Sequence, residues 1–187
     1  MTKRVLILKA SPRAWGNSAA LADQLAQGAL NAGAEAHTVS LHVLDIRPCD
    51  ACDLCRENGG ECVIDDGMQP LYAELRAADA IVIATPVYWF TLSAQAKLFI
   101  DRWYGLLGEK PNPLRGKQFA LLLTYGDDDL ETSGGIHALH TFEHMVRYLK
   151  GEMTGCVHAS ANDPGDVQKQ PALMEEAYSL GKVLGGV

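Results

Sequence analysis

The stretch VLIL at residues 5–8 is the first of three short apolar runs, followed by AIVIA at 80–84 and FALLLT at 119–124. None of them alternates apolar with polar residues, which is typical of strands buried on both faces of a parallel sheet. Two weaker strand candidates are AHTVSL at 36–41 and MTGCVH at 153–158. The sequence therefore predicts five strands.

Segments with helical periodicity separate and follow these strands, at 18–32, 67–78, 93–107, 136–149 and 167–184. Ser18 and Ser93 are candidate N-caps, and Gly33 is a candidate stop signal. Strands that alternate with helices predict right-handed βαβ units and a parallel sheet covered on both faces. The natural five-strand arrangement is a doubly wound α/β sheet in the flavodoxin-like order 2-1-3-4-5. We expect one domain over residues 1–187, with 42–66 as a long loop insertion that contains cysteines.

The composition excludes several classes of protein. With 16 Lys and Arg against 23 Asp and Glu, the formal charge is −7, which argues against nucleic acid and against an anionic membrane surface as partners. The sequence contains no run of 18 apolar residues that could span a membrane. The first apolar run is too short for a signal peptide. We therefore expect a cytoplasmic protein, in which the five cysteines do not form a disulfide framework.

The predicted strand order also places the ligand site. Ligands of open α/β sheets bind beyond the carboxyl ends of the strands, where the winding direction reverses. The loops at that edge are 10–17, 42–66, 85–92 and 125–135, and they contain nearly every unusual residue of the chain.

The loop after the first strand reads SPRAWGNS at 11–18 and leads directly into a helix. A helix N-terminus favours an anion, Ser11, Asn17 and Ser18 add side-chain donors, and Arg13 adds a charge. The loop has neither the P-loop pattern nor the dinucleotide pattern, so a monophosphate such as that of FMN fits best. The alternative is an ordinary turn. The segments Ser11-Pro-Arg13 and Gly16-Asn17-Ser18 resemble the phosphate loop of the NAD(P)H-dependent FMN reductases.

The loops after the third and fourth strands supply candidate walls for a flavin ring, which needs apolar surface and backbone polar groups. The segment ATPVYWF at 84–90 resembles the flavin-ring loop Thr-Pro-x-Tyr of the same family. The alternative is that its aromatic residues pack in a helix or subunit contact. The predicted ring-binding residues are Thr85, Pro86, Val87, Tyr88, Trp89, Phe90, Tyr125, Gly126 and Asp127.

The segment from Cys49 to Cys62 has the spacing C-x2-C-x2-C-x6-C, with Cys52 and Cys55 between the two ends. Thiolates are soft ligands that suit zinc or iron–sulfur clusters. The pattern resembles the compact motif of the iron–sulfur flavoproteins, and this resemblance implies a [4Fe–4S] cluster beside FMN. Zinc and the absence of any metal, with free thiols or a labile disulfide, are the alternatives. By strand order, we expect these cysteines at the same sheet edge as the flavin, within one subunit or across a dimer contact.

Several other residues are expected to have structural roles. Cys156 falls in a strand and is expected to be a small buried apolar residue. Lys97, Asp101 and Arg102 are expected to pair at helical spacing. The histidines of the fourth helix are expected to form a surface or subunit-contact stripe, and these are His137, His140 and His144.

The resemblance implies an FMN-dependent oxidoreductase of the electron-transfer type, in which the flavin supplies the redox chemistry and no side chain need act as acid or base. The alternative is an NAD(P)H-dependent FMN or quinone reductase without a cluster. NAD(P)H is the expected co-substrate, and the acceptor is a redox partner, a quinone or a flavin. The aromatic residues Trp89, Phe90, Trp103 and Tyr104 predict apolar surface that a homodimer or homotetramer would cover.

Overall fold

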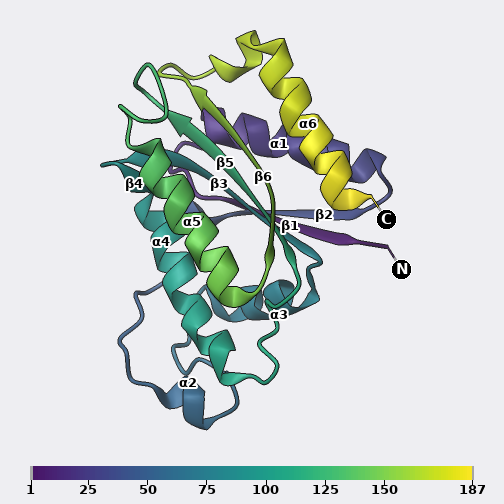
Figure 1. Ribbon diagram of the computed structural model, residues 1–187. Coiled ribbons are helices and arrows are strands. Elements are labelled where there is room, and N and C mark those ends of the chain that lie inside the picture. Colours follow the sequence, from purple (N-terminus) through teal and green to yellow (C-terminus); the bar gives the residue numbers. More distant parts are fainter. Residues whose placement is uncertain (1, 187) are drawn as a thin grey trace.

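The computed structural model describes residues 2–186, and its centre is a parallel sheet (Figure 1). The strand order β2-β1-β3-β5-β6 confirms the predicted order 2-1-3-4-5. A short strand that was not predicted, β4, pairs antiparallel with the end of β3. The strands are β1 (Arg4–Lys9), β2 (Glu35–Ser40), β3 (Ala80–Tyr88), β4 (Thr91–Leu92), β5 (Gln118–Tyr125) and β6 (Glu152–Ser160).

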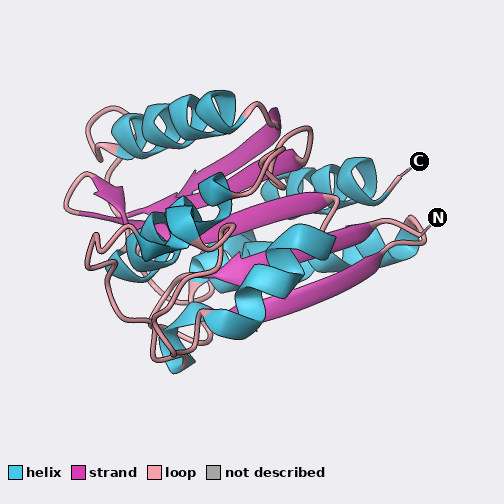
Figure 2. Ribbon diagram, turned by 90° about the horizontal axis from the view of Figure 1, so that it is seen from below, coloured by secondary structure: helices cyan, strands magenta, loops and turns pink. Residues whose placement is uncertain are grey.

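Helices cover both faces of this sheet, as Figure 2 shows. One face carries α1 (Asn17–Asn31) and α6 (Pro171–Gly185), while the other carries α3 (Gln69–Ala77), α4 (Ala94–Asp101) and α5 (Gly135–Leu149). Consecutive residues of a strand point to opposite faces. Each central strand therefore contributes to two separate cores, which explains why its sequence is apolar at every position.

Two glycines bring α1 and α6 into close contact. A Cβ atom at Gly28 would lie 2.0 Å from the carbonyl oxygen of Tyr178, and one at Gly181 would lie 2.0 Å from that of Leu25. The backbones of the two helices can approach so closely only because neither position carries a side chain. This contact fixes the direction of α1, whose N-terminus lies at the carboxyl edge of the sheet.

The structure corrects two predicted helix boundaries. The segment predicted as one helix over 93–107 is α4 followed by the 3-10 helix η2 (Arg102–Gly108), in which Gly105 and Gly108 weaken an α-helix. The segment predicted over 167–184 is the short 3-10 helix η3 (Val167–Lys169) and then α6. The helix α6 starts at Pro171, because proline has no N–H to donate and favours a first turn.

The two predicted N-caps had different outcomes. Ser93 is the N-cap of α4, and its side chain accepts a hydrogen bond from the backbone N–H of Ala96 at 3.2 Å. Ser18 is not an N-cap, because α1 starts one residue earlier. Its N-cap is Gly16, whose own N–H closes a turn onto the carbonyl of Arg13 at 3.0 Å.

The cysteine segment 42–66 runs away from the carboxyl edge of the sheet (Figure 1). It begins within the 3-10 helix η1 (Leu41–Val43) and contains the four-residue helix α2 (Leu54–Glu57), and neither helix was predicted. Figure 1 shows α2 at the bottom of the molecule, beyond the C-terminal end of α4 and far from β4. The expectation that the cysteines share the flavin edge within one subunit is therefore wrong, because strand order does not determine where a long loop docks.

Candidate functional site: a pocket at the carboxyl edge and a cysteine hollow

A pocket of about 260 Å³ opens where four loops meet at the carboxyl edge of the sheet. Three of these loops were predicted from the sequence, and the fourth, after β6, was not. Its lining residues are Ser11, Arg13, Gly16, Asn17, Ser18, Pro86, Val87, Tyr88, Thr124, Tyr125, Gly126, Ala161, Asn162 and Pro164.

The N-terminus of α1 forms one end of this pocket. No side chain caps α1, so its first backbone N–H groups are available to a ligand. Ser18 is 2% exposed, and Ser11 is 6% exposed and accepts a hydrogen bond from the N–H of Arg13 at 3.1 Å. The Arg13 side chain is exposed at the mouth. Free N–H groups, two hydroxyls and one cation are the groups that a phosphate requires.

Asn17 lines the pocket, but its side-chain amide braces the loop after β6. Its Nδ2 donates to the carbonyl of Asp163 at 2.9 Å, and its Oδ1 accepts from the N–H of Gly165 at 3.2 Å. The carboxylate of Asp166 also holds this loop, because it accepts from the N–H groups of Asn162 and Asp163 at 3.1 and 2.8 Å. The hydrogen bond from Lys169 and those backbone donors lower the pKa of Asp166.

The C-terminal end of β3 contributes Pro86, Val87 and Tyr88 to the pocket. Thr85 lies behind them and is fully buried. Its hydroxyl donates to the carbonyl of Pro86 at 2.9 Å and accepts from the N–H of Ser93 at 3.1 Å. Ser93 in turn donates to the carbonyl of Ala10 at 2.7 Å. This chain of hydrogen bonds ties the loop after β3 to the end of β1.

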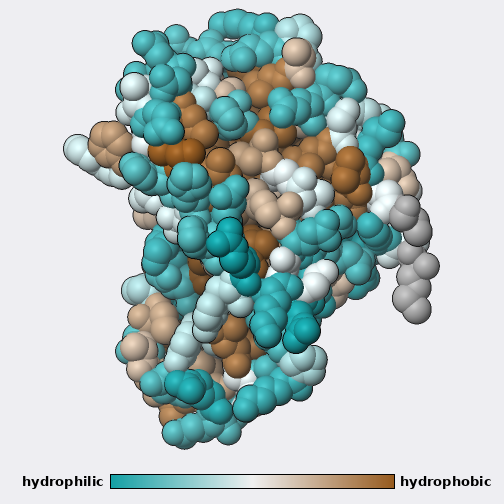
Figure 3. All heavy atoms as spheres, viewed as in Figure 1, coloured by the Kyte–Doolittle hydropathy of each residue, from teal (hydrophilic) through white to brown (hydrophobic). Residues whose placement is uncertain are grey.

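Trp89 and Phe90 form the two-residue turn between β3 and β4, and this hairpin projects from the body of the molecule (Figure 3). Both residues are left-handed, with φ of 49° and 65°, a conformation that bulky residues rarely adopt. Trp89 is 92% exposed and Phe90 is 56% exposed. They line a hollow next to the pocket, which shares Val87 and the 125–126 segment with it.

The loop after β5 closes the other side of the pocket. Tyr125 is only 6% exposed, and its hydroxyl pairs with Nδ1 of His158 at 3.1 Å. Burial raises the pKa of Tyr125. Gly126 approaches the loop after β6 so closely that a Cβ atom there would lie 2.6 Å from Oδ1 of Asn162. Asp127 is exposed and lines the hollow beside Trp89.

The four cysteines of the 42–66 segment line a second, separate hollow. Cys49 and Cys52 are exposed, Cys62 is half-buried and Cys55 is buried. They share the hollow with Asp50, Asp53, Val63, Ile64, Arg102, Tyr104 and Gly105. Within residues 2–186, no three His, Cys, Asp or Glu side chains converge on a position for a single metal ion. The hollow shares no lining residue with the pocket at the carboxyl edge.

Residues of η2 hold this cysteine segment in place. Tyr104 donates to a carboxylate oxygen of Asp53 at 2.9 Å. Gly108 lies so close to the segment that a Cβ atom there would be 2.6 Å from the carbonyl oxygen of Cys55. Burial raises the pKa of Cys55. Burial also opposes ionisation of Cys62, but hydrogen bonds from the Ile64 backbone, Tyr72 and Arg102 outweigh it, so the pKa of that thiol is lowered.

The remaining structural expectations had mixed outcomes. Lys97 and Asp101 form the predicted ion pair at helical spacing, at 2.6 Å. Arg102 does not join them, because its guanidinium pairs with Asp66. Trp103 is 3% exposed and packs edge-on against Phe99, so it does not contribute apolar surface as expected.

The predicted histidine stripe lies on the exposed side of α5, and it consists of His137, His140 and His144. Cys156 lies in β6, as expected, but it is half-buried rather than buried, and burial raises its pKa to about 12. No helix within residues 2–186 has the length and apolar character that a membrane span requires.

Solved structures with the same fold include two proteins of low sequence identity. The Trp repressor binding protein from Bacillus subtilis is 24% identical, with a TM-score of 0.71 over 94% of this chain and 99% of that one. The NAD(P)H:quinone oxidoreductase from Methanothermobacter marburgensis is 18% identical, with a TM-score of 0.73 over 98% of this chain and all of the other.

Sequence relatives add a class of activity to this fold. The Bacillus subtilis protein YwqN, whose name describes an NAD(P)H-dependent FMN-containing oxidoreductase, is 27% identical over 96% of this chain and 97% of that one. An iron–sulfur flavoprotein of Methanosarcina thermophila is 34% identical over 74% of this chain and 71% of that one. Fold and relatives together define a flavin-dependent NAD(P)H oxidoreductase. Residues 3–162 match the NADPH-dependent FMN reductase family, and the chain belongs to that family.

Proposed function

We propose that this chain binds one FMN in the carboxyl-edge pocket, accepts reducing equivalents from NAD(P)H, and holds a [4Fe–4S] cluster on its four-cysteine segment. The observation that supports FMN most strongly is the convergence of four loops on the uncapped N-terminus of α1. When bound, FMN accepts a hydride and can pass electrons on singly or in pairs. The protein supplies binding and orientation.

Each wall of the pocket has a distinct role in this proposal. The backbone N–H groups of α1, together with Ser11, Arg13 and Ser18, bind the phosphate, while Asn17 holds the loop after β6 against it. Pro86, Val87, Tyr88, Tyr125 and Gly126 frame the ring. Thr85 does not touch the ring in this proposal. Its buried hydroxyl supports the pocket wall, because it is hydrogen-bonded to Pro86 and Ser93.

The hollow lined by Trp89, Phe90 and Asp127 is the proposed position for NAD(P)H and for a small planar acceptor, since it adjoins the ring end of the pocket and presents aromatic surface. The proposed acceptors for this hollow are a quinone and a free flavin. A relative from a Shewanella strain, 34% identical over 95% of this chain, is named an FMN-dependent NADH:quinone oxidoreductase, which supports the quinone.

We propose an iron–sulfur cluster rather than zinc for the cysteine hollow. Four thiols surround one small hollow, and thiolates suit both centres. Zinc needs its ligands gathered around one ion, whereas a cubane separates its ligand sulfurs more widely. Three of the cysteines lie at three-residue steps in the sequence. The iron–sulfur flavoprotein relatives support the cluster.

In this proposal, electrons pass between the flavin pocket of one chain and the cysteine hollow of a neighbouring chain. Within one chain the sites are separated by α4, whose eight residues span roughly 12 Å. A homodimer or homotetramer would bring one chain's cysteine hollow nearer to the pocket of another. Trp15, in the loop before α1, and Trp89, in the hairpin turn, are 88% and 92% exposed and supply apolar surface for such a contact.

A second candidate function is an NAD(P)H-dependent FMN or quinone reductase without a cluster. The separation of the two sites within one chain favours it, because the pocket is complete without the cysteines. Two exposed thiols, Cys49 and Cys52, would then be free or oxidised.

Anaerobic reconstitution with iron, sulfide and FMN separates the two functions. Iron and acid-labile sulfide per chain are measured in the wild type and in Cys52→Ala, and reduction of FMN by NADH and by NADPH is followed by its absorbance. We expect a cluster in the wild type only and flavin reduction in both proteins. Near-zero iron in both, with flavin reduction intact, would establish the reductase without a cluster. Absence of flavin reduction in both would contradict the NAD(P)H half of the proposal.

A further inference from the structure

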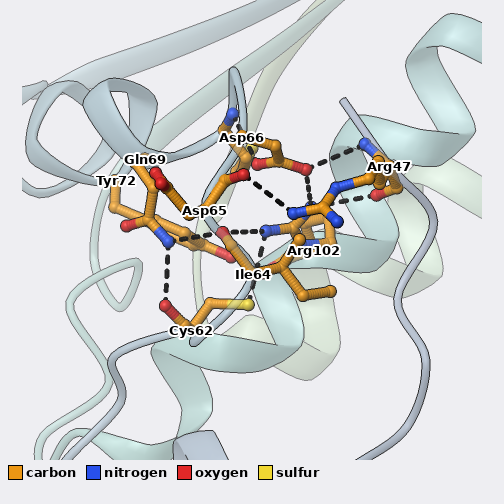
Figure 4. Close-up of polar contacts among 9 residues, drawn as sticks. Arg47, Cys62, Ile64, Asp65, Asp66, Gln69, Tyr72 and Arg102 are labelled. Atoms are coloured by element: carbon orange, nitrogen blue, oxygen red, sulfur yellow. Dashed lines mark hydrogen bonds and ion pairs between the residues drawn. The ribbon is translucent and has the colours of Figure 1, made fainter. Parts of the chain in front are cut away.

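Arg102 is a fully buried cation whose guanidinium reaches the cysteine segment. Its side chain is 0% exposed, and its Nη1 pairs with Asp66 at 2.5 Å. Its Nη2 donates to Sγ of Cys62 at 3.3 Å and to the carbonyl of Ile64 at 3.4 Å. Figure 4 shows the guanidinium between the Asp66 carboxylate and the Cys62 sulfur. Asp66 and Arg102 come from segments that are 36 residues apart.

Stability alone does not account for this arrangement. A buried ion pair recovers little more than its desolvation cost, and a well-packed apolar pair often serves as well. Here Nε of Arg102 is buried without a hydrogen-bond partner, which adds a further cost. The carboxylate of Asp66 already has two other hydrogen-bond donors, because it accepts from the N–H of Arg47 at 2.8 Å and from that of Met68 at 2.9 Å.

The planar guanidinium explains what the arrangement achieves. Arginine presents several donors in a rigid fork, so one edge can bind Asp66 while another donor is held on the Cys62 sulfur. Hydrogen bonds to ligand sulfurs and local charge set the reduction potential of an iron–sulfur cluster. The hydroxyl of Tyr72 donates to the carbonyl of Arg102 at 3.0 Å, which fixes the backbone that carries the guanidinium.

We infer that Arg102 is a positioning residue that holds Cys62 in its ligating orientation and raises the reduction potential of the cluster, with Asp66 opposing it. This inference rests on the proposed cluster and deepens it. The pair then sets the driving force for electron transfer from reduced FMN to the cluster. Among residues 2–186, Arg102 is the one buried cation, because the two other arginines of the segment, Arg47 and Arg56, are exposed.

Two variants shift the potential in opposite directions. Arg102→Lys keeps the charge, but a single ammonium cannot bind Asp66 and the Cys62 sulfur together. We expect the equilibrium constant for one-electron reduction of the cluster to fall about tenfold, which is a shift of ~59 mV to more negative potential. Asp66→Asn removes the opposing negative charge and should shift the potential to a more positive value. The matched control is Arg56→Lys, which changes an exposed arginine of the same segment and should leave the potential unchanged.

The measurement is an anaerobic redox titration of the reconstituted holoprotein, with the cluster followed by electron paramagnetic resonance and FMN by absorbance. Iron per chain and the FMN potential should equal the wild-type values, which a general structural defect would alter. A loaded wild type with all variants at its cluster potential would overturn the inference but leave the proposed function intact. A wild type without iron would overturn both. If Arg102→Lys loses its iron, Asp66→Asn tests the inference: a more positive cluster potential supports it, and an unchanged or more negative potential overturns it.

Discussion

The pocket at the carboxyl edge and the cysteine hollow are built in different ways. The pocket lies where the strands end, and three of its four loops, those after β1, β3 and β6, are linked to one another through Asn17, Thr85 and Ser93. The hollow belongs to one long loop, which a different part of the chain holds in place through Arg102 and Tyr104. A site of the first kind follows from the topology of the sheet, whereas a site of the second kind depends on how a loop docks.

The two sites share no lining residue. Substitutions in the pocket should therefore change flavin binding without changing iron content. Substitutions in the cysteine segment should do the reverse. The following substitutions test this separation, from the largest expected effect to the smallest.

The double variant Arg13→Ala/Ser18→Ala should weaken FMN binding the most. Each of these groups would bind a charged phosphate, and such a hydrogen bond is worth about 1.5–3 kcal/mol, so we expect roughly a hundredfold higher dissociation constant for FMN. The circular dichroism spectrum and iron per chain should not change. The control is Arg115→Ala, an exposed arginine away from the pocket. An unchanged affinity for FMN in the double variant would show that neither residue binds the phosphate.

The variant Asn17→Ala tests whether the loop after β6 is part of the pocket. Its loss frees the carbonyl of Asp163 and the N–H of Gly165, and we expect about tenfold weaker FMN binding, from roughly 1–2 kcal/mol of lost hydrogen bonding. The matched control is Asn31→Ala in the same helix, whose amide donates to the hydroxyl of Tyr178 at 2.9 Å. Equal FMN affinities in the two variants would contradict a role for the loop after β6.

Low pH should destabilise the loop after β6, because it protonates the carboxylate of Asp166. Its pKa is lowered from the ordinary value of 3.8, so its ionised form stabilises the folded loop above that value and this stabilisation is lost as the pH falls through the lower folded-state pKa. Asp166→Asn should therefore bind FMN severalfold more weakly near neutral pH. The difference from the wild type should disappear in acid below 3.8. A constant difference across the titration would show that this carboxylate does not act through its charge.

The hairpin turn should yield the smallest effect. Type I′ turns favour Asn at the first central position, and a left-handed bulky residue costs about 1–2 kcal/mol. Trp89→Asn should therefore raise the free energy of unfolding by up to about 1 kcal/mol, measured by urea denaturation of the flavin-free protein. FMN affinity and iron content should hardly change, because Trp89 lies outside the pocket. A large loss of FMN affinity would instead place the Trp89 side chain on the flavin.

The same comparison explains what could be predicted from the sequence. The three apolar runs predicted β1, β3 and β5 because these strands are largely buried on both faces, whereas the more exposed β2 and β6 had weaker sequence signals. The strand order then brought the loops at 11–18, 85–90 and 125–127 together. The loop after β6 was missed, although Asn162-Asp-Pro164-Gly165 is a clear turn signal that follows a strand end. The position of the cysteine hollow could not be predicted, because the partner of Arg102 is Asp66 rather than a residue at helical spacing.

The identity and amount of flavin on the chain test the central claim most directly. The protein is reconstituted with equal concentrations of FMN and FAD, washed and denatured, and the released flavin is separated and quantified, for the wild type and for Cys52→Ala. We predict one FMN per chain from both proteins, because the proposed phosphate site is the single uncapped N-terminus of α1 and no cysteine lines the pocket. Release of FAD, or loss of FMN in Cys52→Ala, would contradict this account.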